Sequence, residues 1–85
     1  MPVETQGATK SAELPTLRIG AEGGAVTLLQ ELLESQSYRT GGVDGKFGSK
    51  TEQAVKRYQT TFALVTDGIV GAKTWAKLGD RLINP

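Results

Sequence analysis

Apolar side chains recur at helical spacing in three segments of this 85-residue chain. Residues 25–33 place their apolar side chains on almost half of the helix circumference, with Thr27 and Glu31 on the opposite side. In residues 49–62 the apolar positions follow the spacing i, i+1, i+4 and i+8, and in residues 72–83 they follow i, i+3 and i+7. Each segment therefore predicts a helix with one apolar face.

None of these helices can bury its apolar face alone, and Gly-rich connections join them. The pattern predicts an all-α fold, a small three-helix bundle with Gly/Asp-rich connecting loops. Residues 1–16 are polar and lack any period, which predicts a disordered tail or linker before a domain at 17–85. In the second helix, Ser49 and Glu52 have the spacing of a capping box, so we expect the Ser49 hydroxyl to accept a hydrogen bond from the Glu52 amide.

A nine-residue phrase occurs twice, at the start of each of the last two helices. Residues 43–51 are VDGKFGSKT, and residues 66–74 are TDGIVGAKT. The phosphate-loop pattern GxxxxGK[ST] needs Gly directly before Lys, but both copies place an extra residue between them. A calcium loop needs oxygen ligands at its third and fifth positions, whereas counting from Asp44 gives Lys46 and Gly48. The phrase therefore indicates neither nucleotide binding nor calcium binding.

A repeated structural element explains the phrase. We call it the joint, a tight turn in residues 43–51 or 66–74 that leads into the next helix. We expect the Asp of each copy to accept backbone N–H groups in a tight turn, the first Gly to adopt positive φ, and the second Gly to let the chain enter the helix closely. These structural turn residues are Asp44, Gly45, Gly48, Asp67, Gly68 and Gly71. The apolar residue between the glycines is expected to tuck under the bundle, and segments 41–47 and 64–70 are expected to pair weakly. Gln30 and Gln59 stand at matching edges of their helices, and we expect their amides to hold the loop backbone.

Composition narrows the possible chemistry. The chain has no Cys and no His, so it lacks the commonest metal ligand, the commonest general base and any thiol nucleophile. Its Asp and Glu residues show no pairing within one buried face, and we expect no catalysis, no cofactor and no metal. A formal net charge of +1 and the lack of a strongly basic helix argue against nucleic-acid binding. No apolar run reaches the roughly 20 residues of a membrane span, so we expect no membrane insertion, and we expect no signal peptide in this chain because its start has no apolar segment.

An ordered series of residues resembles the peptidoglycan-binding domain family, the three-helix modules appended to bacterial cell-wall hydrolases. The resemblance covers about residues 17–82. Its residues are Leu17, Arg18, Ile19, Gly20, Gly23, Val26, Leu29, Gln30, Leu33, Asp44, Gly45, Lys46, Phe47, Gly48, Thr51, Ala54, Val55, Tyr58, Gln59, Asp67, Gly68, Ile69, Val70, Gly71, Thr74, Trp75 and Leu78. The resemblance implies a non-catalytic module that targets an attached or partner enzyme to murein, in the periplasm or outside the cell. A protein-interaction or scaffold module on the same fold is the alternative.

Peptidoglycan, through its glycan or its stem peptide, is the partner that the resemblance implies, and we expect the domain to act as a monomer. Sugar rings favour aromatic faces, and stem-peptide carboxylates favour Arg and Lys donors. The candidate ligand-binding residues are therefore Tyr38, Arg39, Lys46, Arg57 and Tyr58. Tyr58 is expected in the core, with its hydroxyl reaching the groove. Trp75 lies on an apolar face and is expected in the core rather than in a ligand platform.

Overall fold

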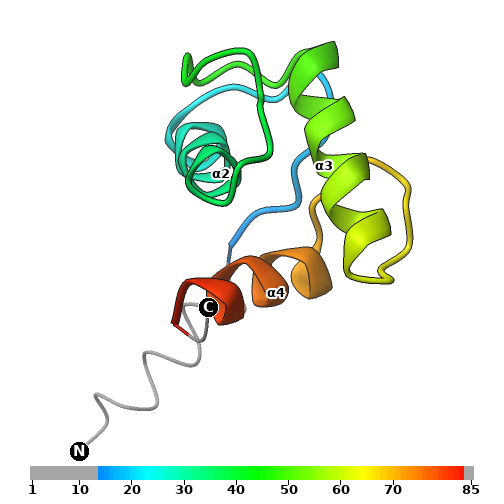
Figure 1. Cartoon of the computed structure of the whole chain (residues 1–85). Helices are drawn as coiled ribbons and strands as arrows, with labels where there is room; N and C mark the ends of the chain where they lie inside the picture. Colours follow the sequence, from blue (N-terminus) through cyan, green and yellow to red (C-terminus); the bar gives the residue numbers. More distant parts are fainter. Residues whose placement is uncertain (1–13, 84–85) are drawn as a thin grey trace, which may run out of the picture.

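Three helices form the framework of the structure, a computed structural model that describes residues 14–83 and the side chains up to Arg81. These helices are α2 (Gly24–Ser35), α3 (Ser49–Thr61) and α4 (Ala72–Ile83) (Figure 1). All three lie where the apolar spacing predicts them, and α2 extends beyond its predicted segment at both ends. Between residues 14 and 83 the only β-structure consists of isolated bridges, so the all-α prediction is confirmed.

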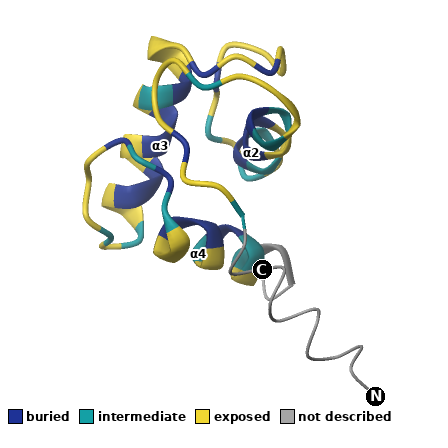
Figure 2. Ribbon diagram, turned by 180° about the vertical axis from the view of Figure 1, so that it is seen from behind, coloured by how far each residue is buried: buried dark blue, intermediate teal, exposed yellow. Residues whose placement is uncertain are grey.

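The predicted apolar faces meet in one core, and Figure 2 shows each helix with a buried side and an exposed side. At most 1% of the surface of the following core side chains is exposed: Val26, Leu29, Leu33, Ala54, Val55, Tyr58 and Leu78. Trp75 is also buried, as expected, and its indole Nε1 donates to the Pro15 carbonyl oxygen at 2.7 Å. This hydrogen bond satisfies the one polar group of the indole, which lets the ring serve as core.

The segment 14–23 ties the two connecting loops to the bundle. Leu17 and Val70 exchange backbone hydrogen bonds of 3.1 and 2.8 Å, and Phe47 N–H donates to the Ala21 carbonyl at 2.9 Å. The predicted pairing of segment 41–47 with segment 64–70 is therefore wrong, because each loop pairs with the N-terminal segment instead. The helix α3 stands between the two loops, and its 13 residues span about 20 Å.

Leu14, three residues before the predicted start of the domain at residue 17, packs against the core, and residues 1–13 of the predicted tail lie outside the described residues. The predicted capping box at the start of α3 is wrong, because Gly48 is the N-cap of α3 and makes no side-chain cap hydrogen bond. The Glu52 amide donates to the Gly48 carbonyl at 3.0 Å, so Ser49 is already the first helical residue.

Candidate functional site

The side-chain amide of Gln30 is the centre of the first joint. Its Nε2 donates to Asp44 Oδ1 at 3.1 Å, to the Lys46 carbonyl at 3.0 Å and to Thr51 Oγ1 at 3.1 Å. Its Oε1 accepts from the backbone N–H groups of Asp44 and Gly45, at 3.1 and 2.9 Å. One buried amide thus links α2, the connecting loop and the first turn of α3.

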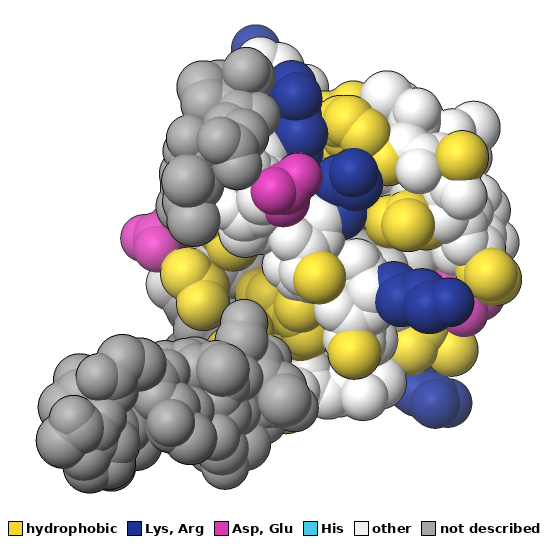
Figure 3. All heavy atoms as spheres, turned by 90° about the horizontal axis from the view of Figure 1, so that it is seen from below, with side chains coloured by type: hydrophobic (Ala, Val, Ile, Leu, Met, Phe, Trp, Pro, Cys, Tyr) yellow, Lys and Arg dark blue, Asp and Glu magenta, His cyan; other side chains and the backbone are white. Residues whose placement is uncertain are grey.

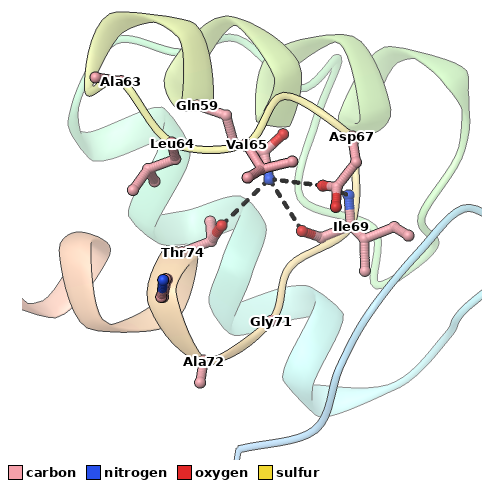
Figure 4. Close-up of a pocket in the computed structure, with 10 residues that line it drawn as sticks. Gln59, Ala63, Leu64, Val65, Asp67, Ile69, Gly71, Ala72 and Thr74 are labelled. Atoms are coloured by element: carbon pink, nitrogen blue, oxygen red, sulfur yellow. Dashed lines mark hydrogen bonds between the residues drawn. The ribbon is translucent and has the colours of Figure 1, made fainter.

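The second joint repeats this arrangement around Gln59 (Figure 4). Gln59 Nε2 donates to Asp67 Oδ1 at 3.2 Å, to the Ile69 carbonyl at 2.9 Å and to Thr74 Oγ1 at 3.2 Å. Gln59 Oε1 accepts from the Gly68 N–H at 3.0 Å. The expectation that both glutamines hold loop backbone is confirmed, and the duplicated phrase corresponds to a duplicated joint.

The Asp-Gly pairs have the geometry that the sequence predicts. Asp44 Oδ1 accepts from the Lys46 N–H at 3.0 Å, and Asp67 Oδ1 accepts from the Ile69 N–H at 2.9 Å. Gly45 and Gly68 have φ values of 74° and 73°, a region that L side chains rarely adopt. Two hydrogen bonds lower the pKa of the Asp44 carboxyl. The one from the Lys46 N–H has the larger effect, and the one from the Gln30 amide has the next largest.

The second glycine of each phrase does not have the predicted role. Gly48 has φ −105° and ψ −166°, and neither Gly48 nor Gly71 lies in the positive-φ region. A Cβ atom built on either residue would meet nothing within 4 Å. Close entry of the chain into the helix therefore does not explain these glycines. The hydrogen bonds of each joint hold the first turn of the following helix through Thr51 or Thr74. Open space lies beside both glycines.

The loop 37–48 lies along α3, and we call the surface between them the α3 seam. Arg57 Nη2 donates to the Arg39 carbonyl oxygen at 3.5 Å. Tyr38 and Arg57 line a hollow of about 480 Å³ on this seam. The structure thus brings three predicted ligand residues together, Tyr38, Arg39 and Arg57, and the Arg39 side chain is exposed.

A carboxylate at the end of α2 anchors this loop. Glu34 Oε2 accepts from the Thr40 backbone N–H at 2.8 Å and from the Thr40 hydroxyl at 2.9 Å. These two hydrogen bonds lower the pKa of the Glu34 carboxyl, and the one from the Thr40 backbone N–H has the larger effect. Thr40 is buried and holds both hydrogen bonds to Glu34. This anchor therefore restrains the backbone of Tyr38 and Arg39, which directly precede Thr40.

Lys46 lies in a different place from the other candidates. It lines a separate hollow of about 260 Å³ at the N-terminal end of α3, together with Lys50. That hollow shares no lining residue with the one that Tyr38 and Arg57 line. Lys46 therefore stands at the far end of the α3 seam rather than beside Tyr38.

Tyr58 is part of the core, as expected, but its hydroxyl does not reach a groove. The residue has 0% of its surface exposed, and its hydroxyl is buried without a hydrogen-bond partner. Burial raises the pKa of Tyr58 to about 12. Its ring packs edge-on against Tyr38, with 5.0 Å between the ring centroids. Tyr58 thus supports the Tyr38 ring from below and cannot itself contact a ligand at the surface.

A hollow between the α3–α4 loop and α4 contains residues that the sequence analysis did not select. Its volume is about 430 Å³, and Figure 4 shows the Gln59 amide among the side chains that line it. A neighbouring hollow of about 420 Å³ on α4 shares two of its lining residues, Leu64 and Lys73. We call these two hollows together the α4 seam. The repeated sequence could have pointed to this seam, because Lys73 in the second copy occupies the same position as Lys50 in the first.

Among residues 14–83, no three or more Asp and Glu side chains gather in a way that could hold a metal ion. No helix in the same range is long and apolar enough to cross a membrane.

Comparison with known proteins gives a match over most of this framework. A family described as "Putative peptidoglycan binding domain" matches residues 22–78. The chain is 46% identical over 78 residues to a protein encoded in the bpoA1 3' region of Kitasatospora aureofaciens, a match that covers 91% of this chain and 65% of that protein. It is also 46% identical over 55 residues to a spore cortex-lytic enzyme of Bacillus cereus, covering 65% of this chain and 21% of the enzyme.

A solved structure agrees with these sequence matches. The crystal structure of the SleB N-terminal domain superposes with a TM-score of 0.78 at 38% sequence identity. The match covers 81% of this chain and 94% of that domain. The chain therefore spans about two thirds of its first curated relative, about a fifth of the cortex-lytic enzyme, and nearly all of an isolated N-terminal domain.

Proposed function

Since the chain belongs to the family of peptidoglycan-binding domains, we propose that it is a non-catalytic module that binds the bacterial cell wall and targets an attached or partner enzyme to murein. The observation that carries this proposal is the family match, which includes both joints from Gln30 to Thr74. The proposed place of action is the cell envelope, in the periplasm or outside the cell, and the proposed active form is a monomer.

Residue chemistry supports a binding role over catalysis. The chain has no His and no Cys, and the Asp44 and Asp67 carboxylates of the joints are already engaged in holding backbone N–H groups. The cortex-lytic relative is about five times as long as the part of it that matches. This length supports an arrangement in which the module and a lytic activity occupy different parts of a longer protein.

The α3 seam is the proposed contact surface. Tyr38 offers part of an aromatic ring, on which a sugar ring can stack, and its position is fixed by the buried Tyr58 ring behind it. Arg39 and Arg57 offer guanidinium groups, which pair well with stem-peptide carboxylates. Lys46 adds a positive charge at the far end of the same loop. The ligand of this surface is the murein glycan, the stem peptide, or the junction between them.

Cosedimentation with purified murein sacculi tests the proposal. A murein-binding module pellets with the sacculi in a saturable manner, and free murein fragments reduce the bound fraction. A scaffold module on the same fold, the alternative, remains in the supernatant and instead copurifies with a protein partner. Binding to random duplex DNA at low salt would contradict both functions.

A further inference from the structure

The duplicated joint produces two seams, although the sequence analysis placed ligand-binding candidates only on the α3 seam. In each copy a residue with positive φ, Ser37 or Ala63, follows directly after the C-cap residue of the preceding helix. The next N–H, that of Tyr38 or Leu64, donates to a helix carbonyl at 2.8 Å in both cases. Leu64 on the α4 seam therefore occupies the structural position of Tyr38 on the α3 seam.

The two seams differ in chemistry. Tyr38, Arg39 and Arg57 make the α3 seam aromatic and cationic. The α4 seam is lined by Leu64, Val65 and Ile69 together with the charged residues Lys73, Lys77, Asp67 and Asp80, and the Asp67 carboxylate is engaged in the second joint. Figure 3, which views the molecule from the side of α4, shows hydrophobic and basic side chains next to one another on that face. The duplication has thus kept the backbone joint and changed the surface above it.

Val65 is the apolar residue that the fold itself does not explain. It has 76% of its surface exposed, more than any other exposed large hydrophobic side chain in the described part of the chain. It lines the larger hollow of the α4 seam, where Leu64 and Ile69 are only partly covered. Exposed aliphatic side chains that gather at a hollow are typical of ligand contact surfaces.

Two positive charges flank these apolar side chains. Lys73 lines both hollows of the seam, and Lys77 follows one helical turn later on the same side of α4. The Lys77 ammonium lies 5.6 Å from the centroid of the Phe62 ring, which holds it at the edge of the seam. A ligand that rests on Leu64 and Val65 therefore has the Lys73 ammonium in the same hollow to pair with a carboxylate.

From this arrangement we infer that the α4 seam is a second recognition site, which takes the carboxyl-terminal part of a murein stem peptide. Small alkyl side chains such as those of alanine fit against Leu64 and Val65, and the free carboxylate pairs with Lys73. Charge complementarity favours this ligand over a neutral sugar, which offers no partner to Lys73. The inference rests on the proposed wall-binding function and adds the ligand class of a separate surface.

A soluble peptide tests the assignment without sacculi. The probe is the synthetic pentapeptide L-Ala-γ-D-Glu-L-Lys-D-Ala-D-Ala, titrated into the isotopically labelled full chain while backbone amide shifts are recorded. We expect saturable shifts at Leu64, Val65 and Lys73. The same peptide with a carboxyl-terminal amide should bind about tenfold more weakly, because the charge-assisted contact is lost.

Three variants locate the site. Lys73→Gln should weaken binding of the acid about tenfold and bring it to the level of the amide, because the ionic partner is removed. Val65→Ser should weaken the binding of both peptides by about threefold to tenfold, since it removes apolar contact. Arg18→Ala, an exposed arginine on the segment 14–23 that lines neither seam, is the control and should leave the peptide affinity unchanged.

Several results would overturn the inference. These are no saturable shifts with the pentapeptide, equal affinity for the acid and the amide, wild-type affinity in Lys73→Gln and Val65→Ser, or shifts confined to the α3 seam. The proposed function fails separately, because it requires binding of the wild-type chain to sacculi. A chain that pellets with sacculi but ignores the pentapeptide keeps the proposed function and loses this site.

Discussion

Gln30 Nε2 and Thr51 Oγ1 lie 3.1 Å apart in the buried space between α2 and α3, and the same pair of groups recurs as Gln59 and Thr74 at 3.2 Å. Each glutamine is at most 1% exposed. The Gln30 amide makes five hydrogen bonds and the Gln59 amide makes four, and each amide joins two helices and a loop. These bonds are a large share of the polar contacts in so small a domain. The two joints therefore fix the loops that form the seams.

Replacement of either glutamine by leucine should destabilise the fold. Gln59→Leu keeps an apolar body but leaves the Gly68 N–H and the Ile69 carbonyl without their partner, at a cost of about 2–3 kcal/mol in the free energy of unfolding. Gln30→Leu should cost a similar amount. Urea denaturation measures both. Gln53→Leu, an exposed position on α3, is the control and should change the free energy of unfolding by less than about 0.5 kcal/mol. If all three variants had the same free energy of unfolding as the wild type, the joints would not hold the fold.

The first glycine of each joint should resist substitution. Gly45→Val and Gly68→Val should each lower the free energy of unfolding by roughly 1–3 kcal/mol, because a β-branched side chain cannot easily take positive φ. A Cβ at Gly68 would also lie 3.0 Å from the Glu52 Cγ atom. Thermal denaturation gives the change. Gly24→Ala, which meets open space at the start of α2, should be neutral or stabilising. Unchanged melting temperatures in both valine variants would contradict the turn assignment.

Stability should fall in acid because two carboxyl groups are stabilised as carboxylates. Hydrogen bonds in the folded state lower the pKa of Glu34 below 4.5 and that of Asp44 below 3.8. The unfolded state therefore binds more protons in acid, so this stabilisation is present above the ordinary pKa values and is lost as the pH falls through the lowered ones. Melting temperatures measured from neutral pH downwards should decline less steeply in Glu34→Gln and Asp44→Asn. Glu31→Gln, on the exposed side of α2, should follow the wild type. Identical slopes for all four proteins would exclude the two anchors as the source.

Sequence reasoning predicts the helices and the joints because both depend on local patterns. Apolar spacing locates the helices, and the duplicated Asp-Gly phrase identifies the turns without any knowledge of the packing. It fails where the outcome depends on contacts between distant segments. The pairing partner of each loop is the segment 14–23, and Ser49 has no cap role because Gly48 is the N-cap of α3.

The binding surface is less predictable than the fold. Tyr58 is selected as an aromatic near a loop, yet the thickness of the core keeps its hydroxyl inside. Lys46 is close to Arg39 in the chain, but the turn at Gly45 places it in another hollow. Ser37 and Ala63 take positive φ without being glycine, so their turns carry no local signal. The α4 seam is missed because its main residues are ordinary loop and helix-surface types.

Arg39 gives the sharpest separation of binding from stability. Its side chain is exposed and has no core role, so Arg39→Ala should change the melting temperature by less than about 2 °C. The same variant should bind sacculi roughly tenfold more weakly, because a charge-assisted contact to the wall is lost. Added salt should narrow the difference from the wild type, since the lost interaction is ionic. Arg18→Ala, an exposed arginine on the segment 14–23, is the control and should bind as the wild type does. A large drop in melting temperature, or full binding by Arg39→Ala, would remove Arg39 from the site.

The central claim is that this chain binds the cell wall, and the bound fraction of the wild-type chain on purified sacculi at low salt measures it most directly. The account predicts a saturable isotherm, with binding reduced by an excess of soluble muropeptides and unaffected by an excess of an unrelated polysaccharide. A chain that stays in the supernatant at every sacculus concentration, while a known murein binder pellets from the same mixture, would contradict it.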